Sequence, residues 1–132
     1  MTLSTPARRR ILVVDDHVDV ADSLAMLLEC TQYEVRTAYN GQEAVETARL
    51  FMPDLIILDI DMPVMDGFAA ARMLRHDGDT QLLIALTGQT RPLDRIEARQ
   101  SGFDMFLPKP IDGEYLLSMV DSVLQGLTPD SV

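Results

Sequence analysis

The sequence predicts an α/β fold in which a five-stranded parallel sheet forms the middle layer of a three-layer αβα sandwich. Short runs rich in Val, Ile and Leu alternate with amphipathic stretches of ten or more residues, and this βα pattern occurs five times. The runs are apolar on both strand faces, and such strands need helices on both sides of the sheet. Acidic residues directly follow two of the runs, which marks one sheet edge as the place for a polar site.

The first βα unit consists of a strand at about 10–14 and a helix over 18–30. The residues predicted to form the buried face of that helix recur at helical spacing: Val20, Leu24, Leu27 and Leu28.

The second unit consists of a strand at about 34–38 and a helix at about 41–51. Asn40 is expected to cap the start of this helix, because its side chain can accept a hydrogen bond from a free backbone N–H. Pro53 follows the helix as a stop signal.

The third strand is expected at 54–58, and its loop runs from Asp59 to the Asp66-Gly67 pair. That pair begins a helix of about 67–77, which Gly78 closes.

The fourth strand is predicted at 82–86, followed by a helix from about Pro92, a residue suited to the first helical position, to Gly102. The fifth strand is predicted at about 104–107. The last helix is indicated by apolar residues at helical spacing: Leu116, Leu117, Val120, Val123 and Leu124.

Length and composition limit the possible functions. A chain of 132 residues fits one domain, which we expect over 10–125 between flexible segments at 1–9 and 126–132. The formal net charge of −10 and the pI of about 4.4 argue against direct nucleic-acid binding. A single cysteine, Cys30, permits no internal disulfide, and neither a signal-length nor a membrane-spanning apolar stretch occurs. We therefore expect a cytoplasmic protein without membrane insertion.

The acidic residues and two further polar residues are predicted to converge. Asp15 and Asp16 follow the first strand and Asp59 the third, while Thr87 and Lys109 follow the fourth and fifth. The carboxyl ends of parallel strands in right-handed βαβ units lie at one edge of the sheet. Two carboxylates about 4 Å apart repel by roughly 4 kcal/mol at an effective dielectric near 20. A Mg²⁺ ion and the Lys109 ammonium together carry three positive charges, which would formally balance the three carboxylates of Asp15, Asp16 and Asp59.

Four motifs in a fixed order make the chain resemble the receiver domains of two-component response regulators. The resemblance extends from about Arg10 to Gln125, and it implies the flavodoxin-like strand order 2-1-3-4-5. The motifs are ILVVDD at 11–16, LDIDMPVMDG at 58–67, LTG at 86–88 and FLPKP at 106–110.

The resemblance implies a role for each acidic residue. Asp59 would be the phospho-acceptor, taking a phosphoryl group from a phosphohistidine on a histidine kinase or histidine phosphotransfer protein. Asp16 and Asp59 would bind Mg²⁺ directly, with the backbone carbonyl of Asp61 as a further ligand, and Asp15 would act through bound water. An unidentified downstream protein would read the phosphorylated state, with a homodimer as one further possibility.

The same resemblance implies how phosphorylation is sensed. Lys109 would pair with a phosphoryl oxygen, the Thr87 hydroxyl would move to meet another, and Phe106 would turn inward as Thr87 moves. The Lys109-Pro110 bond is expected to be cis. The surface of the fourth helix, fifth strand and last helix would carry the signal.

Several questions stay open at the level of sequence. The Asp59-x-Asp61 spacing is also that of haloacid dehalogenase-like phosphatases, and an unphosphorylated receiver-like interaction module is a third alternative. A flavodoxin is disfavoured because aspartates follow the first strand in place of a phosphate-binding loop. A stand-alone regulator and a receiver from a hybrid histidine kinase are equally compatible with the sequence.

The roles of some neighbouring residues are also left open. Asp61 and Gln89 occupy positions at which receiver domains vary and tune the phosphoryl lifetime, without a direction that the sequence decides. His17 could be a metal ligand or a phosphodonor, but it is interpreted in preference as a residue at the start of a helix. The spaced arginines of the fourth helix are interpreted mainly as a solvated face: Arg91, Arg95 and Arg99.

Overall fold

The computed structural model describes residues 8–62, 66–77, 81–88 and 92–125, and within them it contains one parallel sheet of order β2-β1-β3-β4-β5. This confirms the predicted fold class and strand order. The strands are β1 (Arg10–Val14), β2 (Glu34–Ala38), β3 (Leu55–Asp59), β4 (Leu82–Thr87) and β5 (Met105–Pro108). The helices are α1 (Val18–Glu29), α2 (Gly41–Phe51), α3 (Gly67–His76), α4 (Pro92–Ser101) and α5 (Gly113–Gln125).

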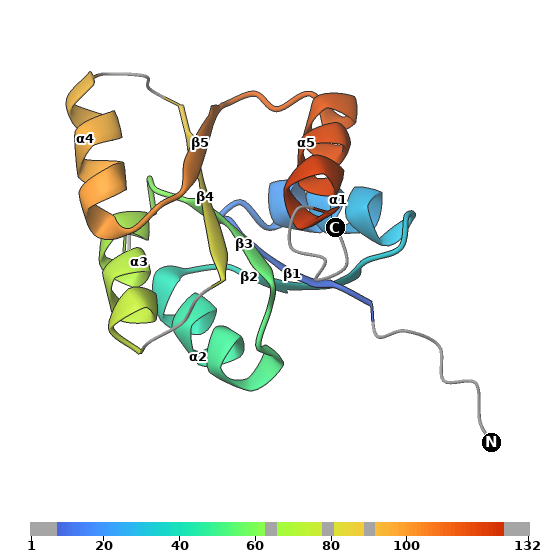
Figure 1. Ribbon diagram of the computed structural model, residues 1–132, viewed down its shortest axis with the longest axis horizontal. Coiled ribbons are helices and arrows are strands. Elements are labelled where there is room, and N and C mark those ends of the chain that lie inside the picture. The colour runs from blue at the N-terminus through green and yellow to red at the C-terminus, as the bar shows by residue number, and fades with distance from the viewer. Residues whose placement is uncertain (1–7, 63–65, 78–80, 89–91, 126–132) are drawn as a thin grey trace.

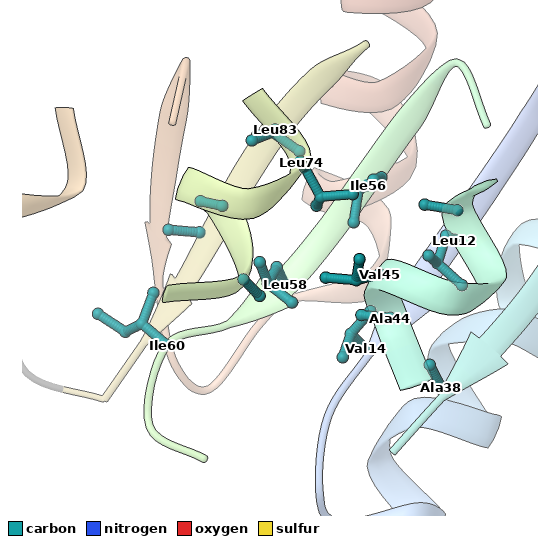
Figure 2. Packing of buried hydrophobic residues seen from close by; sticks show 14 of the residues in the cluster. Leu12, Val14, Ala38, Ala44, Val45, Ile56, Leu58, Ile60, Leu74 and Leu83 are labelled. Carbon is teal, nitrogen blue, oxygen red and sulfur yellow. The ribbon is translucent and has the colours of Figure 1, made fainter. Parts of the chain in front are cut away.

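Helices cover both faces of the sheet, with α1 and α5 on one side and α2, α3 and α4 on the other (Figure 1). The central strands supply side chains to two separate cores because alternate residues of a strand point to opposite faces. Leu12 and Val14 of β1 join the core under α2 and α3, part of which Figure 2 shows. Ile11 and Val13 join the core under α1 and α5.

Local signals at helix ends behave largely as predicted. The Asn40 Oδ1 atom accepts a hydrogen bond from the Glu43 N–H, and Asp66 caps α3 in the same way by accepting from the Ala69 N–H. Helix α2 ends at Phe51 as predicted, but the left-handed conformation of its C-cap residue Met52, with a φ of 54°, was not predicted. Gly102 follows α4 with a φ of 107°, a conformation that glycine adopts readily.

Two expectations need correction. In α1 the fully buried positions include the small residues Ala21 and Ala25 together with Leu28, while Val20 is 43% exposed. The predicted residues Leu24 and Leu27 are partly buried and Leu28 is fully buried, so only Val20 is wrong, and the small residues let the helix lie close to the sheet. The strands also end later than predicted: Asp59 and Thr87 are the last residues of their strands, not the first residues after them. Gly78 lies outside the described residues.

None of the helices in the described ranges has the length and apolarity needed to cross a bilayer.

Candidate functional site

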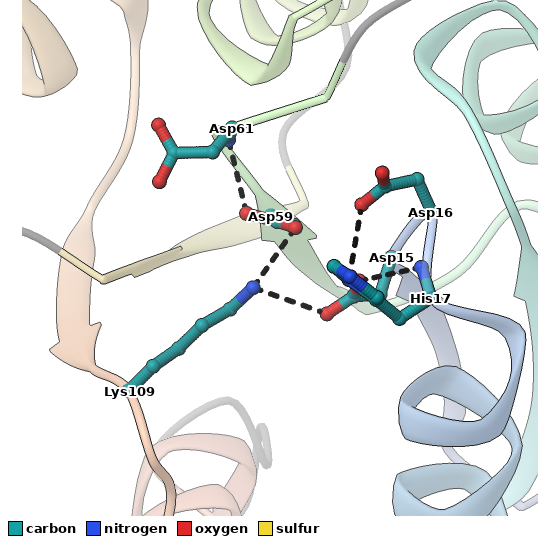
Figure 3. Close-up of polar contacts among 6 residues, drawn as sticks. All are labelled: Asp15, Asp16, His17, Asp59, Asp61 and Lys109. Atoms are coloured by element: carbon teal, nitrogen blue, oxygen red, sulfur yellow. Dashed lines mark hydrogen bonds and ion pairs between the residues drawn. The ribbon is translucent and has the colours of Figure 1, made fainter.

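Strand register brings the predicted site residues to one edge of the sheet. Asp15 directly follows β1, while Asp59 and Thr87 end the adjoining strands β3 and β4. Lys109 directly follows β5, and its backbone N–H donates to the Thr87 carbonyl oxygen at 2.8 Å. Asp16 comes from the turn between β1 and α1. Figure 3 shows the acidic side chains and the Lys109 ammonium facing one another from these strand ends.

Asp59 lies at the centre of the group. Its side chain is 1% exposed, and its Oδ2 atom lies 2.9 Å from Lys109 Nζ. Its Oδ1 atom accepts a hydrogen bond of 2.9 Å from the Asp61 backbone N–H. Lys109 and the Asp61 N–H therefore orient the two carboxylate oxygens of Asp59. Just past the strand, the Ile60 N–H donates to the Leu86 carbonyl oxygen at 3.1 Å, which extends the pairing of β3 with β4.

Asp15 is a fully buried carboxylate in an electrostatically crowded place. Its Oδ1 atom accepts a 2.9 Å hydrogen bond from the His17 N–H, and its Oδ2 atom lies 3.4 Å from Lys109 Nζ. Burial raises the pKa of Asp15 and the nearby Asp59 carboxylate adds to this rise, while the His17 N–H and Lys109 only partly counteract it. The raised pKa of Asp15 therefore reflects mainly the burial of its carboxylate.

Lys109 is the cation that links the two buried carboxylates. Burial alone would lower its pKa, but the hydrogen bond and charge of Asp59, together with Asp15, outweigh burial and raise the pKa. The ammonium therefore stays charged. The peptide bond between Lys109 and Pro110 is cis.

The two predicted switch residues lie on neighbouring strands next to this group. Thr87 is 5% exposed at the end of β4. Phe106 of β5 is half-buried and packs against the core under α2 and α3. In the register of β4 with β5, Phe106 pairs with Ala85, two residues before Thr87.

The acidic group fits a hard divalent cation. One potential ligand atom from each of Asp15, Asp16, His17 and Asp59 lies within 4.8 Å of the others. Asp15 Oδ2 and Asp16 Oδ1 are buried atoms without a hydrogen-bond partner among the described residues, although each has an ion-pair contact, with Lys109 and His17 respectively. Buried carboxylate oxygens that lack donors are suitable ligands for Mg²⁺.

Not every residue considered from the sequence joins the group. The Asp61 carboxylate is exposed and turns away from Asp59 in Figure 3, so that only its backbone N–H reaches the acceptor. Gln89 and Arg91 lie outside the described residues, as does the side chain of Arg95.

His17 was given too little weight from the sequence. Its imidazole contacts both Asp15 and Asp16, whereas the interpretation preferred from the sequence was a residue at a helix start and not a metal ligand. It does precede α1 directly, as the N-cap, but its side chain makes no capping bond. Its position immediately after two aspartates was the available signal.

Comparisons with known proteins agree with this fold and geometry. The family model for the response regulator receiver domain matches residues 11–121. Response regulator MprA of Mycolicibacterium vanbaalenii is 38% identical over 121 residues, which cover 92% of this chain and 52% of that protein. The chain spans about half the length of the curated relatives it matches.

Solved structures show the same relationship. Chemotaxis protein CheY4 of Vibrio cholerae superposes with a TM-score of 0.84 at 33% identity, covering 89% of this chain and 99% of that one. The signal receiver domain of a signal transduction histidine kinase from Syntrophus aciditrophicus gives a TM-score of 0.82 at 38% identity, covering 94% and 96%. This chain belongs to the receiver domain family of two-component response regulators.

Proposed function

We propose that this receiver is a phosphorylation-controlled switch in which Asp59 accepts a phosphoryl group from a phosphohistidine of a histidine kinase or histidine phosphotransfer protein. The observation that carries the proposal is the pairing of the buried Asp59 carboxylate with Lys109 Nζ at 2.9 Å, at the carboxyl edge of a parallel sheet. A carboxylate is a sufficient nucleophile for phosphoryl transfer when the site supplies positioning and charge neutralisation.

In the proposed reaction, an Asp59 oxygen forms a bond to phosphorus as the bond from phosphorus to the donor imidazole nitrogen breaks. The imidazole nitrogen keeps the electron pair of the broken bond, and Asp59 becomes an acyl phosphate. The Asp61 N–H, 2.9 Å from Asp59 Oδ1, keeps the carboxylate oriented for attack. Lys109 is placed to follow the negative charge from the carboxylate onto a phosphoryl oxygen.

We propose that Mg²⁺ is the resident cation. Asp16 and Asp59 would hold it directly together with the backbone carbonyl of Asp61, and Asp15 would hold it through water. The bound ion would neutralise charge on the phosphoryl oxygens. The carboxylate oxygens of Asp15 and Asp16 that lack hydrogen-bond donors support this assignment.

We propose that Thr87 and Phe106 report the phosphorylated state. Thr87 would move its hydroxyl toward a phosphoryl oxygen, and the half-buried Phe106 ring would turn inward. The face formed by α4, β5 and α5 would then change, which shifts a pre-existing equilibrium between two surface conformations. Ile96 of α4 and Tyr115 of α5 are more than half exposed and would be available to a downstream protein or a second copy.

Phosphorylation is tested by incubating the protein with acetyl phosphate and Mg²⁺ and measuring its intact mass. We expect one added phosphoryl group in the wild-type protein and none in Asp59→Asn. Asp61→Asn is the matched control, because it removes a carboxylate that turns away from Asp59 and should leave phosphorylation in place. An undiminished phosphoryl group on Asp59→Asn would overturn the assignment, and turnover of an external phosphomonoester would favour the rival phosphatase.

The switch needs a separate test. The chain has no tryptophan, so Phe106→Trp provides a single fluorescent reporter at the proposed switch position. We expect its emission to change when acetyl phosphate and Mg²⁺ are added, and not to change when Asp59→Asn is also present. Equal changes in both proteins would show that the aromatic residue does not sense phosphorylation.

The pathway context is part of the same proposal. The folding unit would be residues 10–125, working in the cytoplasm either alone or as the receiver of a larger regulator or hybrid histidine kinase. Both contexts occur among the relatives, because MprA is a response regulator and the Syntrophus structure is the receiver domain of a histidine kinase. Phosphotransfer profiling against the kinases and phosphotransfer proteins of the source organism would identify the donor.

A further inference from the structure

We propose that His17 is a nitrogen ligand of the cation site, so that this receiver binds zinc-like divalent transition ions more tightly than an oxygen-only site would. The inference rests on the metal site of the proposed function and adds a metal preference to it. Mg²⁺ takes oxygen ligands, whereas imidazole is a good ligand for Zn²⁺, Co²⁺ and Ni²⁺.

The spacing of the three side chains carries the inference. His17 Nδ1 lies 3.3 Å from Asp15 Oδ1 and 3.4 Å from Asp16 Oδ1. Ligand atoms at about 2.1 Å from one metal ion, separated by angles of about 90–110°, lie roughly 3.0–3.4 Å apart. The imidazole nitrogen is therefore already at the separation from both carboxylates that shared coordination requires. Asp59 also has an oxygen in the same group, which spans less than 4.8 Å.

The backbone holds His17 in this position. Its N–H donates to Asp15 Oδ1 at 2.9 Å, and its carbonyl oxygen accepts from the Ala21 N–H at 3.0 Å, in the first turn of α1. The side chain is not engaged as a helix cap. Because it is 71% exposed and Asp15 is fully buried, the imidazole lies on the solvent side of that carboxylate.

The competing explanation is that His17 only hydrogen-bonds to the carboxylates. The two explanations differ in what a glutamine would do at this position. Glutamine keeps a side-chain N–H donor but is a poor ligand for Zn²⁺, so His17→Gln preserves the hydrogen bond and removes the proposed coordination.

The first test observes the imidazole itself. The chain has two histidines, and His76 lies at the end of α3, so that ¹⁵N-labelled protein gives only two ring systems by NMR. A Cys30→Ser background removes the exposed thiol as a competing zinc ligand. Stoichiometric Zn²⁺ should shift the Nδ1 resonance of His17 strongly and leave His76 unchanged. An unshifted His17 ring at saturating Zn²⁺ would overturn the proposal.

The second test compares affinities by calorimetry in the same background. His17→Gln and His17→Ala should each weaken Zn²⁺ binding by at least tenfold, since even an outer partner of a metal ligand costs 10–100-fold when removed. Mg²⁺ affinity should stay within about threefold, because its ligands are oxygens. His76→Ala is the matched control and should bind both ions like the parent protein. If His17→Gln binds Zn²⁺ with the parent affinity, His17 is not a metal ligand and only hydrogen-bonds to the carboxylates.

The outcome is separable from that of the proposed function. Phosphorylation of the same preparation by acetyl phosphate with Mg²⁺ is read by intact mass. Phosphorylation without a His17-dependent Zn²⁺ affinity would overturn this inference alone. A His17 ring that responds to Zn²⁺ in a protein that takes no phosphoryl group would overturn the proposed function alone.

Discussion

Replacement of Gly67 by alanine should displace the end of the strand that carries Asp59. Gly67 is the first residue of α3, and its N–H donates to the Ile60 carbonyl oxygen at 3.3 Å. A Cβ atom at this position would lie 2.6 Å from Ile60 Cα and 2.7 Å from the Asp59 carbonyl oxygen. The first distance is about 0.8 Å short of the 3.4 Å at which ordinary contact begins. Both neighbours are backbone atoms, so no side-chain rotation can relieve the overlap.

The size of the effect follows from this overlap. Overpacking costs about 1–3 kcal/mol, and a clash with backbone belongs at the upper end, partly offset by the better helix propensity of alanine. We expect a net loss of about 2 kcal/mol in the free energy of unfolding, or roughly 6–10 °C in Tm for a domain of this size. A shift approaching 1 Å at the acceptor should also slow phosphorylation by about tenfold to a hundredfold.

The assays are thermal unfolding followed by circular dichroism and the rate of phosphoryl incorporation from acetyl phosphate. Gly88→Ala is the matched control for stability, because a Cβ atom there has no neighbour within 4 Å. Its Tm should stay close to that of the wild-type protein. If Gly67→Ala unfolds within about 1 °C of wild type and is phosphorylated at the same rate, the close packing of Gly67 against the acceptor strand has no functional role.

Three further changes test separate parts of the structure. Lys109→Met should lower the phosphorylated fraction and, by removing a positive charge that lies beside the Asp15 and Asp59 carboxylates, tighten Mg²⁺ binding in calorimetry; weaker Mg²⁺ binding would contradict this. Tyr33→Phe removes the hydrogen bond to Asp121 and should cost about 1–2 kcal/mol in urea unfolding at pH 7. Burial and Asp121 raise the pKa of Tyr33 from 10.0 to about 12, so this contribution is complete below pH 10 and lost as pH rises toward 12; a variant and wild type that differ equally at pH 7 and pH 12 would refute it. Asp66→Ala removes the cap of α3 and should cost about 1 kcal/mol, with an unchanged urea midpoint as the contrary result.

The sequence was sufficient to predict the elements because each has its own local signal, whereas the strand order came from the resemblance to receiver domains. β-branched runs marked the strands, and Asn40 and Pro92 marked the starts of α2 and α4. Parallel connectivity then placed the site residues at one edge without further information. Strand ends were predicted less well, because Asp59 and Thr87 are polar in sequence yet buried within their strands by tertiary packing.

Other features depend on packing that the sequence does not display. Val20 has the right spacing for the buried face of α1, but the helix approaches the sheet through Ala21 and Ala25, which are too small to stand out in an apolar pattern. The contact of His17 with two carboxylates depends on side-chain direction at a turn. The close approach of Gly67 to the Asp59 carbonyl oxygen likewise depends on the tertiary packing of the start of α3 against the end of β3.

The central claim is that Asp59, among several neighbouring carboxylates, carries the phosphoryl group. Reduction of the phosphorylated protein with borohydride converts an aspartyl phosphate to homoserine, and peptide mapping by mass spectrometry locates that residue. We predict the modification at position 59 and at no other aspartate. Homoserine at position 15, 16 or 61, or no modification in the presence of acetyl phosphate and Mg²⁺, would contradict the claim.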